Sequence, residues 1–456
     1  MINQRLNIVI LAAGRGTRMH SDRPKVLHQV AGRAILSHVI ACAEQLGPER
    51  VVVVYGFGGE IVPQTISRPD ITWAMQAEQL GTGHAVQQAL PWLNRDGITL
   101  VMLGDVPLLQ ASTCKSLLTH AATCLALLTV EKPDPAGYGR ILRNANGQVQ
   151  AIVEQKDAND EQRAIREVNS GIMAMPTARL IEWLARLDNQ NNQAEYYLTD
   201  IIAMAVADGV GVVSEMAADE WEVTGINSKQ DLASVERQYQ RQTAAGLVQA
   251  GVTLLDPERL DVRGDIKVGR DVSIDIGCIF EGTVDIGDNV SIGAYCIIKN
   301  ARLGNGTTVA PYSHIDDAQV GQDCRIGPYA RLRPGSQLSS DAHIGNFVEI
   351  KNSQIGSGSK INHLSYVGDA TVGREVNIGA GTITCNYDGV NKHRTIIGDH
   401  AFIGSDSQLV APVTVGNGAT IGAGSTITKN APTDALTLSR GKQITITGWK
   451  RPEKKI

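Results

Sequence analysis

The chain has 456 residues and a net charge of −5, and 43% of its residues are hydrophobic, enough to bury more than one core. A charge this small argues against a general coat for nucleic acid, and no apolar run reaches the roughly 18 residues that a membrane span needs. The seven cysteines are scattered without metal-ligand spacing, as is typical of reduced thiols. We therefore expect a multidomain cytoplasmic protein that acts on small molecules, with neither nucleic acid nor a membrane as partner.

The first half of the chain alternates strand and helix patterns. Five short runs are too uniformly apolar to leave one face in water, and so predict buried strands. They cover residues 6–13, 50–57, 71–75, 98–109 and 125–130. Residues 24–47 carry apolar side chains at helical spacing and predict one amphipathic helix. The alternation predicts an α/β domain over residues 1–227 with an open, mostly parallel sheet, whose ligands bind beyond the carboxyl ends of the strands.

A single long helix is expected next, over residues 228–250. Ser228 and Asp231 resemble a capping box, and Leu232, Val235 and Tyr239 fall on one helical stripe. This segment is predicted to link the first domain to the rest of the chain.

Residues 251–456 follow a different period, in which an aliphatic residue recurs every six positions between Val268 and Ile427. Three such hexads close a triangular coil of about 18 residues, so about 160 residues predict roughly eight or nine coils. The repeat breaks once, at residues 384–395, which predicts a loop that leaves the coils. The expected domain is an all-β parallel solenoid.

A glycine-rich turn, "LAAGRGTRM", follows the first predicted strand. Its backbone N–H groups, with Arg15, Arg18 and Lys25 nearby, are suited to holding an anion. The turn lacks the ending of a P-loop and the third glycine of a dinucleotide fingerprint. On its own it is equally well explained as a structural turn.

Further motifs give the turn a context. "LAAGRGTRM" with "PK" at 24 and 25, "QAEQLGTGHA" (76–85) and "GDVPLL" (104–109) resemble the signature of sugar-1-phosphate nucleotidyltransferases. With "HLSYVGD" and "NIGAGTITCNYDG" in the repeat region, the whole chain is similar to the bacterial bifunctional N-acetylglucosamine-1-phosphate uridyltransferases and glucosamine-1-phosphate N-acetyltransferases. The resemblance implies a Rossmann-like domain, a linker helix and a left-handed parallel β-helix that forms a homotrimer.

The activity implied by the resemblance has two steps. Acetyl-CoA would acetylate glucosamine-1-phosphate, and UTP would then convert the product to UDP-N-acetylglucosamine, with release of pyrophosphate. The second step joins two polyanions, so it needs cations and alignment rather than a base. Arg18 meets this need and is the expected catalytic residue, while Asp105 and Asn227 are implied ligands of Mg²⁺. The implied contacts of UTP and of the sugar nucleotide are Leu11, Ala12, Ala13, Gly14, Lys25, Gln76, Gly81, Thr82, Leu103, Gly104, Asp105, Gly139, Glu154, Asn169 and Asn227.

Acetyl transfer to a sugar amine needs a base, a role that histidine fits well. The repeat region has five histidines, and residue type alone does not choose among them; the resemblance of "NHLSY" points to His363. The implied contacts of glucosamine-1-phosphate are Arg333, Lys351, Tyr366 and Asn377. Those of acetyl-CoA are Ala380, Asn386, Tyr387, Ser405, Ala423 and Arg440.

The alternative hypothesis is a single-function nucleotidyltransferase whose solenoid only holds subunits together. A scaffold of that kind needs only inward aliphatic residues and glycines. The outward "RLRPGS", "EIKNS", "NHLSY" and "CNYDG" segments favour a second reaction centre instead.

Overall fold

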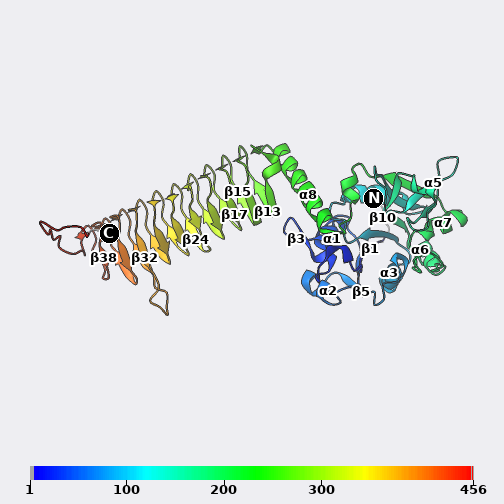
Figure 1. Cartoon of the computed structure of the whole chain (residues 1–456), viewed down its shortest axis with the longest axis horizontal. Coiled ribbons are helices and arrows are strands. Elements are labelled where there is room, and N and C mark those ends of the chain that lie inside the picture. The colour runs from blue at the N-terminus through cyan, green and yellow to red at the C-terminus, as the bar shows by residue number, and fades with distance from the viewer. Residues whose placement is uncertain (1–4, 453, 455–456) are drawn as a thin grey trace. The chain divides into compact units, whose positions relative to one another are not determined.

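The computed structural model describes residues 5–452 and 454, and the chain divides into two compact units between Tyr239 and Gln240. The division falls inside the long helix α8 (Lys229–Gln249), in the segment predicted as a linker (Figure 1). At its start, Ser228 N donates to the Asp231 carboxylate at 2.9 Å and Asp231 N donates to the Ser228 hydroxyl at 3.1 Å, which is a capping box. No helix among the described residues is long and apolar enough to cross a membrane.

The first unit is built on one twisted sheet, with strand order β11-β7-β10-β6-β1-β4-β5. The pairs β1–β4, β1–β6, β4–β5 and β7–β11 are parallel, and β10 runs antiparallel to its neighbours. All five predicted strands are present, as β1, β4, β5, β6 and β7, although β6 ends at Leu103 and residues 104–109 of the predicted run are not strand. The sheet strands are β1 (Leu6–Ala12), β4 (Arg50–Tyr55), β5 (Thr72–Met75), β6 (Ile98–Leu103), β7 (Leu125–Glu131), β8 (Arg140–Arg143), β9 (Val149–Val153), β10 (Glu167–Pro176) and β11 (Val212–Met216).

Helices cover both faces of this sheet and bury an apolar core on each. One core includes residues of α1 and α4, and the other includes residues of α3, α6 and α7. The helices are α1 (Ile35–Glu44), α2 (Ile61–Ile66), α3 (Thr82–Ala89), α4 (Ala111–His120), α5 (Asp160–Arg163), α6 (Thr177–Leu184) and α7 (Asp200–Ala207).

The helix predicted over residues 24–47 is present only in its second part, as α1, and is wrong for the first part. Lys25–Leu27 forms a single 3-10 turn, and β2 (Gln29–Val30) pairs with β3 (Arg33–Ala34) as a hairpin before α1 begins. The hairpin turns through Ala31 and Gly32, whose φ angles of 49° and 77° are left-handed and cannot continue a helix. Helical spacing of the apolar residues did not reveal this turn.

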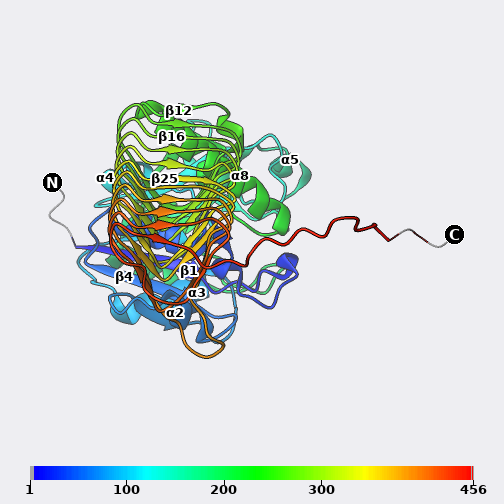
Figure 2. The same cartoon turned by 90° about the vertical axis from the view of Figure 1, so that its left-hand side faces the viewer.

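The second unit is a parallel solenoid (Figure 2). From β16 to β36 each coil gives one strand to one sheet and two strands to another, whereas the first two coils give the second sheet one long strand each, β13 and β15. In most coils, partner residues lie 17 or 18 positions apart, as in Ile279↔Ile297 and Ile297↔His314, and the coil that carries the loop widens this to 25, as in Asn377↔Phe402. This all-parallel pairing fits a left-handed β-helix. One sheet has eleven strands, more than the roughly eight or nine predicted coils, because the coils extend into end segments without the hexad pattern.

The solenoid strands are short. The eleven-stranded sheet comprises β12 (Thr253–Leu254), β14 (Ser273–Ile274), β16 (Ser291–Ile292), β19 (Thr308–Val309), β22 (Arg325–Ile326), β25 (His343–Asn346), β28 (Lys360–His363), β31 (Asn377–Ile378), β34 (Phe402–Ile403), β37 (Thr420–Ile421) and β39 (Leu436–Thr437). The other sheet comprises β13 (Asp261–Val268), β15 (Ile279–Ile286), β17 (Ile297–Lys299), β18 (Arg302–Leu303), β20 (His314–Asp316), β21 (Ala318–Val320), β23 (Arg331–Leu332), β24 (Ser336–Leu338), β26 (Glu349–Lys351), β27 (Gln354–Ile355), β29 (Tyr366–Gly368), β30 (Ala370–Val372), β32 (Ile383–Cys385), β33 (Thr395–Ile397), β35 (Gln408–Val410), β36 (Val413–Val415) and β38 (Thr426–Ile427).

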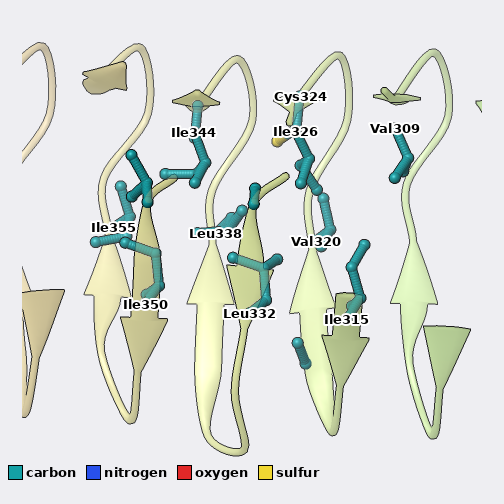
Figure 3. Close-up of a cluster of buried hydrophobic side chains, with 14 of the residues drawn as sticks. Val309, Ile315, Val320, Cys324, Ile326, Leu332, Leu338, Ile344, Ile350 and Ile355 are labelled. Atoms are coloured by element: carbon teal, nitrogen blue, oxygen red, sulfur yellow. The ribbon is translucent and has the colours of Figure 1, made fainter. Parts of the chain in front are cut away.

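The predicted aliphatic positions form the solenoid core. Val309, Ile326 and Ile344 are buried one above another in successive coils (Figure 3). The predicted loop is also present, because β32 ends at Cys385 and β33 begins at Thr395. Each coil therefore turns its aliphatic side chains inward and leaves its corners and outer faces for polar chemistry.

Candidate functional sites

A cavity of 270 Å³ lies at the carboxyl ends of β1, β5 and β6, where a parallel sheet is expected to bind ligands. Most of the predicted nucleotide contacts line it: Leu11, Ala12, Ala13, Gly14, Lys25, Gln76, Gly81, Thr82, Leu103 and Asp105. The sequence did not indicate four further lining residues, which are Val26, Gln79, Ala85 and Glu195.

The glycine-rich turn after β1 packs against the stem of Lys25. A Cβ atom at Gly16, whose φ is +61°, would lie 2.8 Å from the Lys25 Cβ. A side chain at position 16 would therefore push against the Lys25 stem. Arg18 follows on a 3-10 turn and is exposed. Arg15 is also exposed and lines neither this cavity nor the 410 Å³ cavity described below.

Lys25 lies between the two predicted magnesium ligands. Its ammonium donates to Asp105 Oδ2 at 2.5 Å and to Asn227 Oδ1 at 3.0 Å. Asn227 is brought there by the chain before α8, since Ile226 N donates to the Asp105 carbonyl and Asn227 N donates to Asp231. Two residues 122 positions apart (105 and 227) thus present oxygens to one cation.

A second cavity, of 410 Å³, shares Leu103 and Asp105 with the first. Arg18, the predicted catalytic residue, and Asn227, the second predicted metal ligand, both line this second cavity. Lys132 also lines it, with its ammonium 3.3 Å from Glu220 and 5.3 Å from the Tyr138 ring centroid. The sequence did not indicate Lys132, because the residues around it match no recognisable motif.

Gly139, Glu154 and Asn169, three of the predicted contacts of UTP and the sugar nucleotide, are brought together. Asn169 N donates to the Gly139 carbonyl at 2.9 Å, and a Cβ atom at Gly139 would lie 3.3 Å from Glu154 Oε1. Burial raises the pKa of Glu154, which accepts a hydrogen bond from Thr199 at 2.9 Å. Gly104 has a structural contact instead, donating to the Leu11 carbonyl at 2.8 Å and so joining the ends of β1 and β6.

The segment of residues 76–85, which resembles part of the nucleotidyltransferase signature, has a buried amide at Gln76. Gln76 Nε2 lies 3.1 Å from the Gly81 carbonyl, to which it donates, and 3.0 Å from His84 Nδ1. Gly81 has a φ of +108°, and a Cβ atom there would meet the Tyr196 backbone. Thr82 begins α3, and its hydroxyl accepts from Leu198 N. The segment is thus held rigidly at the wall of the first cavity.

The solenoid places four predicted acetyl-site residues at one corner of successive coils: His363, Ala380, Ser405 and Ala423. In the next coil, Asp406 N donates to the Ala380 carbonyl at 2.7 Å. In the coil after it, Gly424 N donates to the Ser405 carbonyl at 2.8 Å. Arg440 Nη1 donates to the Ala423 carbonyl at 3.1 Å, so this predicted cation lies at the same corner. These residues form a continuous row.

The residue that follows in each corner has a left-handed backbone and changes character along the solenoid. In four early coils it is an exposed aromatic residue, and the rings stack with centroids 5.4, 5.0 and 5.3 Å apart. These residues are Tyr295, Tyr312, Tyr329 and Phe347. The position then carries Leu364, Gly381, Asp406 and Gly424 in the coils that hold His363, Ala380, Ser405 and Ala423. Glycine at two of these positions leaves the corner open beside Ala380 and Ala423.

A group of cations lies on the sheet that contains β26 and β29. Arg333 Nη1 donates to the Glu349 carboxylate at 2.8 Å. The Lys351 ammonium lies 3.6 Å from the Asp369 carboxylate, and the Tyr366 hydroxyl lies over Gly368, where a Cβ atom would collide with it. Asn377 is on β31 of the eleven-stranded sheet and does not share this face.

The loop between β32 and β33, which leaves the coils, folds back toward these cations. Tyr387 and Lys392 form an antiparallel bridge, and the neighbouring Lys351 ammonium lowers the pKa of Lys392. The sequence did not single out Lys392, because its neighbour is 41 positions away (351 to 392) and on another strand. Tyr387 is exposed, with its hydroxyl 2.5 Å from the Gly389 carbonyl.

Asn386 anchors this loop. It is buried, and its Nδ2 donates to Asp369, which also accepts from Asn352 at 2.6 Å. Burial alone would raise the pKa of Asp369, but the two amides and Lys351 together lower it. The Asn386 amide nitrogen is thus engaged by Asp369, whereas Tyr387 is the predicted loop residue with an exposed side chain.

Comparisons with known proteins agree with both units. The profile of a MobA-like NTP transferase domain matches residues 8–170, that of a GMPPB C-terminal domain matches residues 262–346, and that of bacterial transferase hexapeptide (six repeats) matches residues 394–429. The fold and sites therefore define a nucleotidyltransferase joined to a hexapeptide-repeat transferase.

Full-length relatives narrow this class. "Bifunctional protein GlmU" of Methylobacillus flagellatus is 66% identical, with 99% of this chain and 98% of that protein covered. The proteins of the same name from Cupriavidus pinatubonensis and Chromobacterium violaceum are 61% and 58% identical, each with 99% of both chains covered. The chain belongs to the GlmU family of bifunctional proteins. A solved structure from Bacillus anthracis, described as a glucose-1-phosphate thymidylyltransferase, is 16% identical with a TM-score of 0.43 over 51% of this chain and 95% of that one, too distant a likeness to decide anything.

Proposed function

We propose that the chain is a bifunctional enzyme that makes UDP-N-acetylglucosamine. Its solenoid transfers the acetyl group of acetyl-CoA to glucosamine-1-phosphate, and its first unit transfers uridylyl from UTP to the resulting N-acetylglucosamine-1-phosphate. Full-length identity to GlmU proteins supports this proposal, together with the two cavities that meet at Asp105. The single-function alternative does not explain the row of polar and small residues at the solenoid corner.

In the first unit, the attacking sugar phosphate oxygen is already a nucleophile. The residues therefore need to align the two substrates and neutralise their negative charge. Arg18 and Lys25 present cations to the phosphates, and the N–H groups of the glycine turn add to them. Gln76, Gly81 and Thr82 hold the base, while Gly139, Glu154 and Asn169 hold the acetylated sugar.

The residues at Asp105 also fit Mg²⁺. Asp105 and Asn227 already share the Lys25 ammonium, so their oxygens converge on one cation. No group of three His, Cys, Asp or Glu side chains suited to a metal occurs in the described part of the chain, and Mg²⁺ needs few protein ligands because it keeps several waters. When bound, the ion would supply positive charge to neutralise the phosphates.

In the solenoid, His363 accepts a proton from the sugar amine as it attacks the thioester. Arg333, Lys351 and Tyr366 hold the sugar phosphate, and Asn377, which lies on the other sheet, joins them from another subunit of the trimer proposed below. The open row at Ala380, Ser405 and Ala423, with Asn386, Tyr387 and Arg440, takes acetyl-CoA. We further propose that the protein is cytoplasmic and forms a homotrimer. The trimer is expected because flat solenoid faces associate readily around a threefold axis.

The proposal is tested by incubating the purified chain with glucosamine-1-phosphate, acetyl-CoA, UTP and Mg²⁺, with one component omitted at a time. Free thiol should appear without UTP or Mg²⁺, whereas pyrophosphate should require all four. Supplying N-acetylglucosamine-1-phosphate should remove the need for acetyl-CoA. Pyrophosphate without any sugar phosphate, or no thiol release at all, would contradict the proposal.

A further inference from the structure

The proposed base has a side-chain partner in the neighbouring coil. His363 ends β28, and the strand register pairs it with Asn346 at the end of β25. Asn346 Oδ1 lies 2.8 Å from His363 Nδ1. The two residues are 17 positions apart (346 to 363), one coil of the solenoid.

This contact has a chemical consequence for the ring. A carbonyl oxygen can only accept, so Nδ1 must carry the hydrogen, and in a neutral imidazole the lone pair is then on Nε2. We propose that Asn346 is a positioning residue that holds His363 in the Nδ1–H tautomer and fixes the direction of Nε2. This inference rests on the proposed role of His363 as the base.

The backbone around the pair is fixed independently of the side chains. Leu364 N donates to the Asn346 carbonyl at 3.1 Å, and the Ser365 hydroxyl donates to the His363 carbonyl at 2.8 Å. Gly345 lets the two coils approach, since a Cβ atom there would collide with the Asn362 carbonyl. The remaining freedom of His363 is rotation of its exposed ring, and Asn346 is the contact that restrains it.

The chemistry of the partner also matters. Three of the four other solenoid histidines lie within ion-pair distance of carboxylates: His343 of Asp341, His393 of Asp388 and His400 of Glu375. Within residues 5–452, His363 forms no ion pair and has an amide partner instead. An amide orients the ring without adding a negative charge that would favour the protonated imidazolium, which cannot act as a base.

The test compares Asn346→Ala with Asn362→Ala in the full-length enzyme. Asn362 is adjacent to His363, and its side chain makes no hydrogen bond within residues 5–452, so it is a matched control. We expect Asn346→Ala to lower kcat for acetyl transfer about tenfold, the worth of one hydrogen bond, with KM for both substrates within about twofold. Uridylyl transfer by both variants should equal that of the parent, which also shows that they fold.

Two further readouts separate positioning from a general structural role. Nitrogen-15 spectra of the histidine ring should show the Nδ1–H tautomer of His363 in the parent and loss of that signature in Asn346→Ala. Asn346→Asp should restore the tautomer. It should also move the pH at which acetylation reaches half of its maximum rate upward by about one unit, because a carboxylate favours imidazolium.

Parent-like kcat in Asn346→Ala, or an Nε2–H tautomer in the parent, would overturn the inference. His363→Ala, assayed alongside, keeps the two proposals apart. If it abolishes acetylation while Asn346→Ala does not change it, the positioning role fails and the base remains. If His363→Ala keeps full acetylation, the proposed base itself fails.

Discussion

Replacing Lys25 by methionine tests the arrangement at Asp105 most sharply. The Lys25 ammonium is held between Asp105 and Asn227, and the Lys25 and Asp105 side chains are only 11% and 17% exposed. A hydrogen bond between charged groups at such a site is worth about 1.5–3 kcal/mol. A divalent ion that binds the same two oxygens must displace the ammonium, so its affinity in the parent is lowered by this amount.

The Lys25→Met variant should therefore bind Mn²⁺ or Mg²⁺ about 10- to 100-fold more tightly than the parent when no nucleotide is present. Its metal-free Tm should fall because the Asp105 carboxylate loses its cation, and added metal should restore it. UTP should bind more weakly, because the proposed phosphate-binding cation is gone. Metal affinity can be measured by Mn²⁺ paramagnetic resonance and by calorimetry.

The matched control is Lys132→Met. Lys132 lines the second cavity, but its ion-pair partner is Glu220, and within the described residues it forms no hydrogen bond with Asp105 or Asn227. This variant should bind metal like the parent. Unchanged or weaker metal binding by Lys25→Met, with a normal control, would refute the competition between the ammonium and the ion.

Two further substitutions probe the two sites separately. Gly368→Ala places a Cβ atom against the Tyr366 hydroxyl, so KM for glucosamine-1-phosphate in thiol-release assays should rise about tenfold while pyrophosphate production is unchanged; an unchanged KM would show that the hydroxyl is not needed there. Glu154→Gln removes a carboxyl whose pKa is raised by burial, and such a group stabilises the fold below its unfolded pKa and loses that contribution as pH rises through the folded value. The Tm of Glu154→Gln relative to the parent should therefore be higher at pH 7 than at pH 4, and a relative Tm that falls over this range would contradict the assigned burial effect.

The sequence revealed what depends on local periodicity. Hexad spacing identified the inward positions such as Ile326 and Ile344, because each coil repeats the same burial. Helical spacing failed at Ala31 and Gly32, where a left-handed turn interrupts an otherwise suitable pattern. The terminal coils were missed because their short strands, such as β12 and β39, lack the hexad signal.

The candidate sites divide in the same way. Motifs indicated residues next to glycine turns and strand ends, including Gly14, Gln76 and Asp105, which line one cavity. Partners such as Asn346 and Lys392 could not be identified, because their proximity to His363 and Lys351 depends on coil length and on the path of the loop. Only the folded chain brings those pairs together.

The central claim is that two separate reaction centres lie in one chain, and Arg18→Ala and His363→Ala test it together. Arg18→Ala should release thiol but no pyrophosphate, His363→Ala should make pyrophosphate only from N-acetylglucosamine-1-phosphate, and a mixture of the two should form UDP-N-acetylglucosamine from glucosamine-1-phosphate. A folded variant that loses both half-reactions would contradict the account. A variant that keeps both half-reactions would contradict it as well.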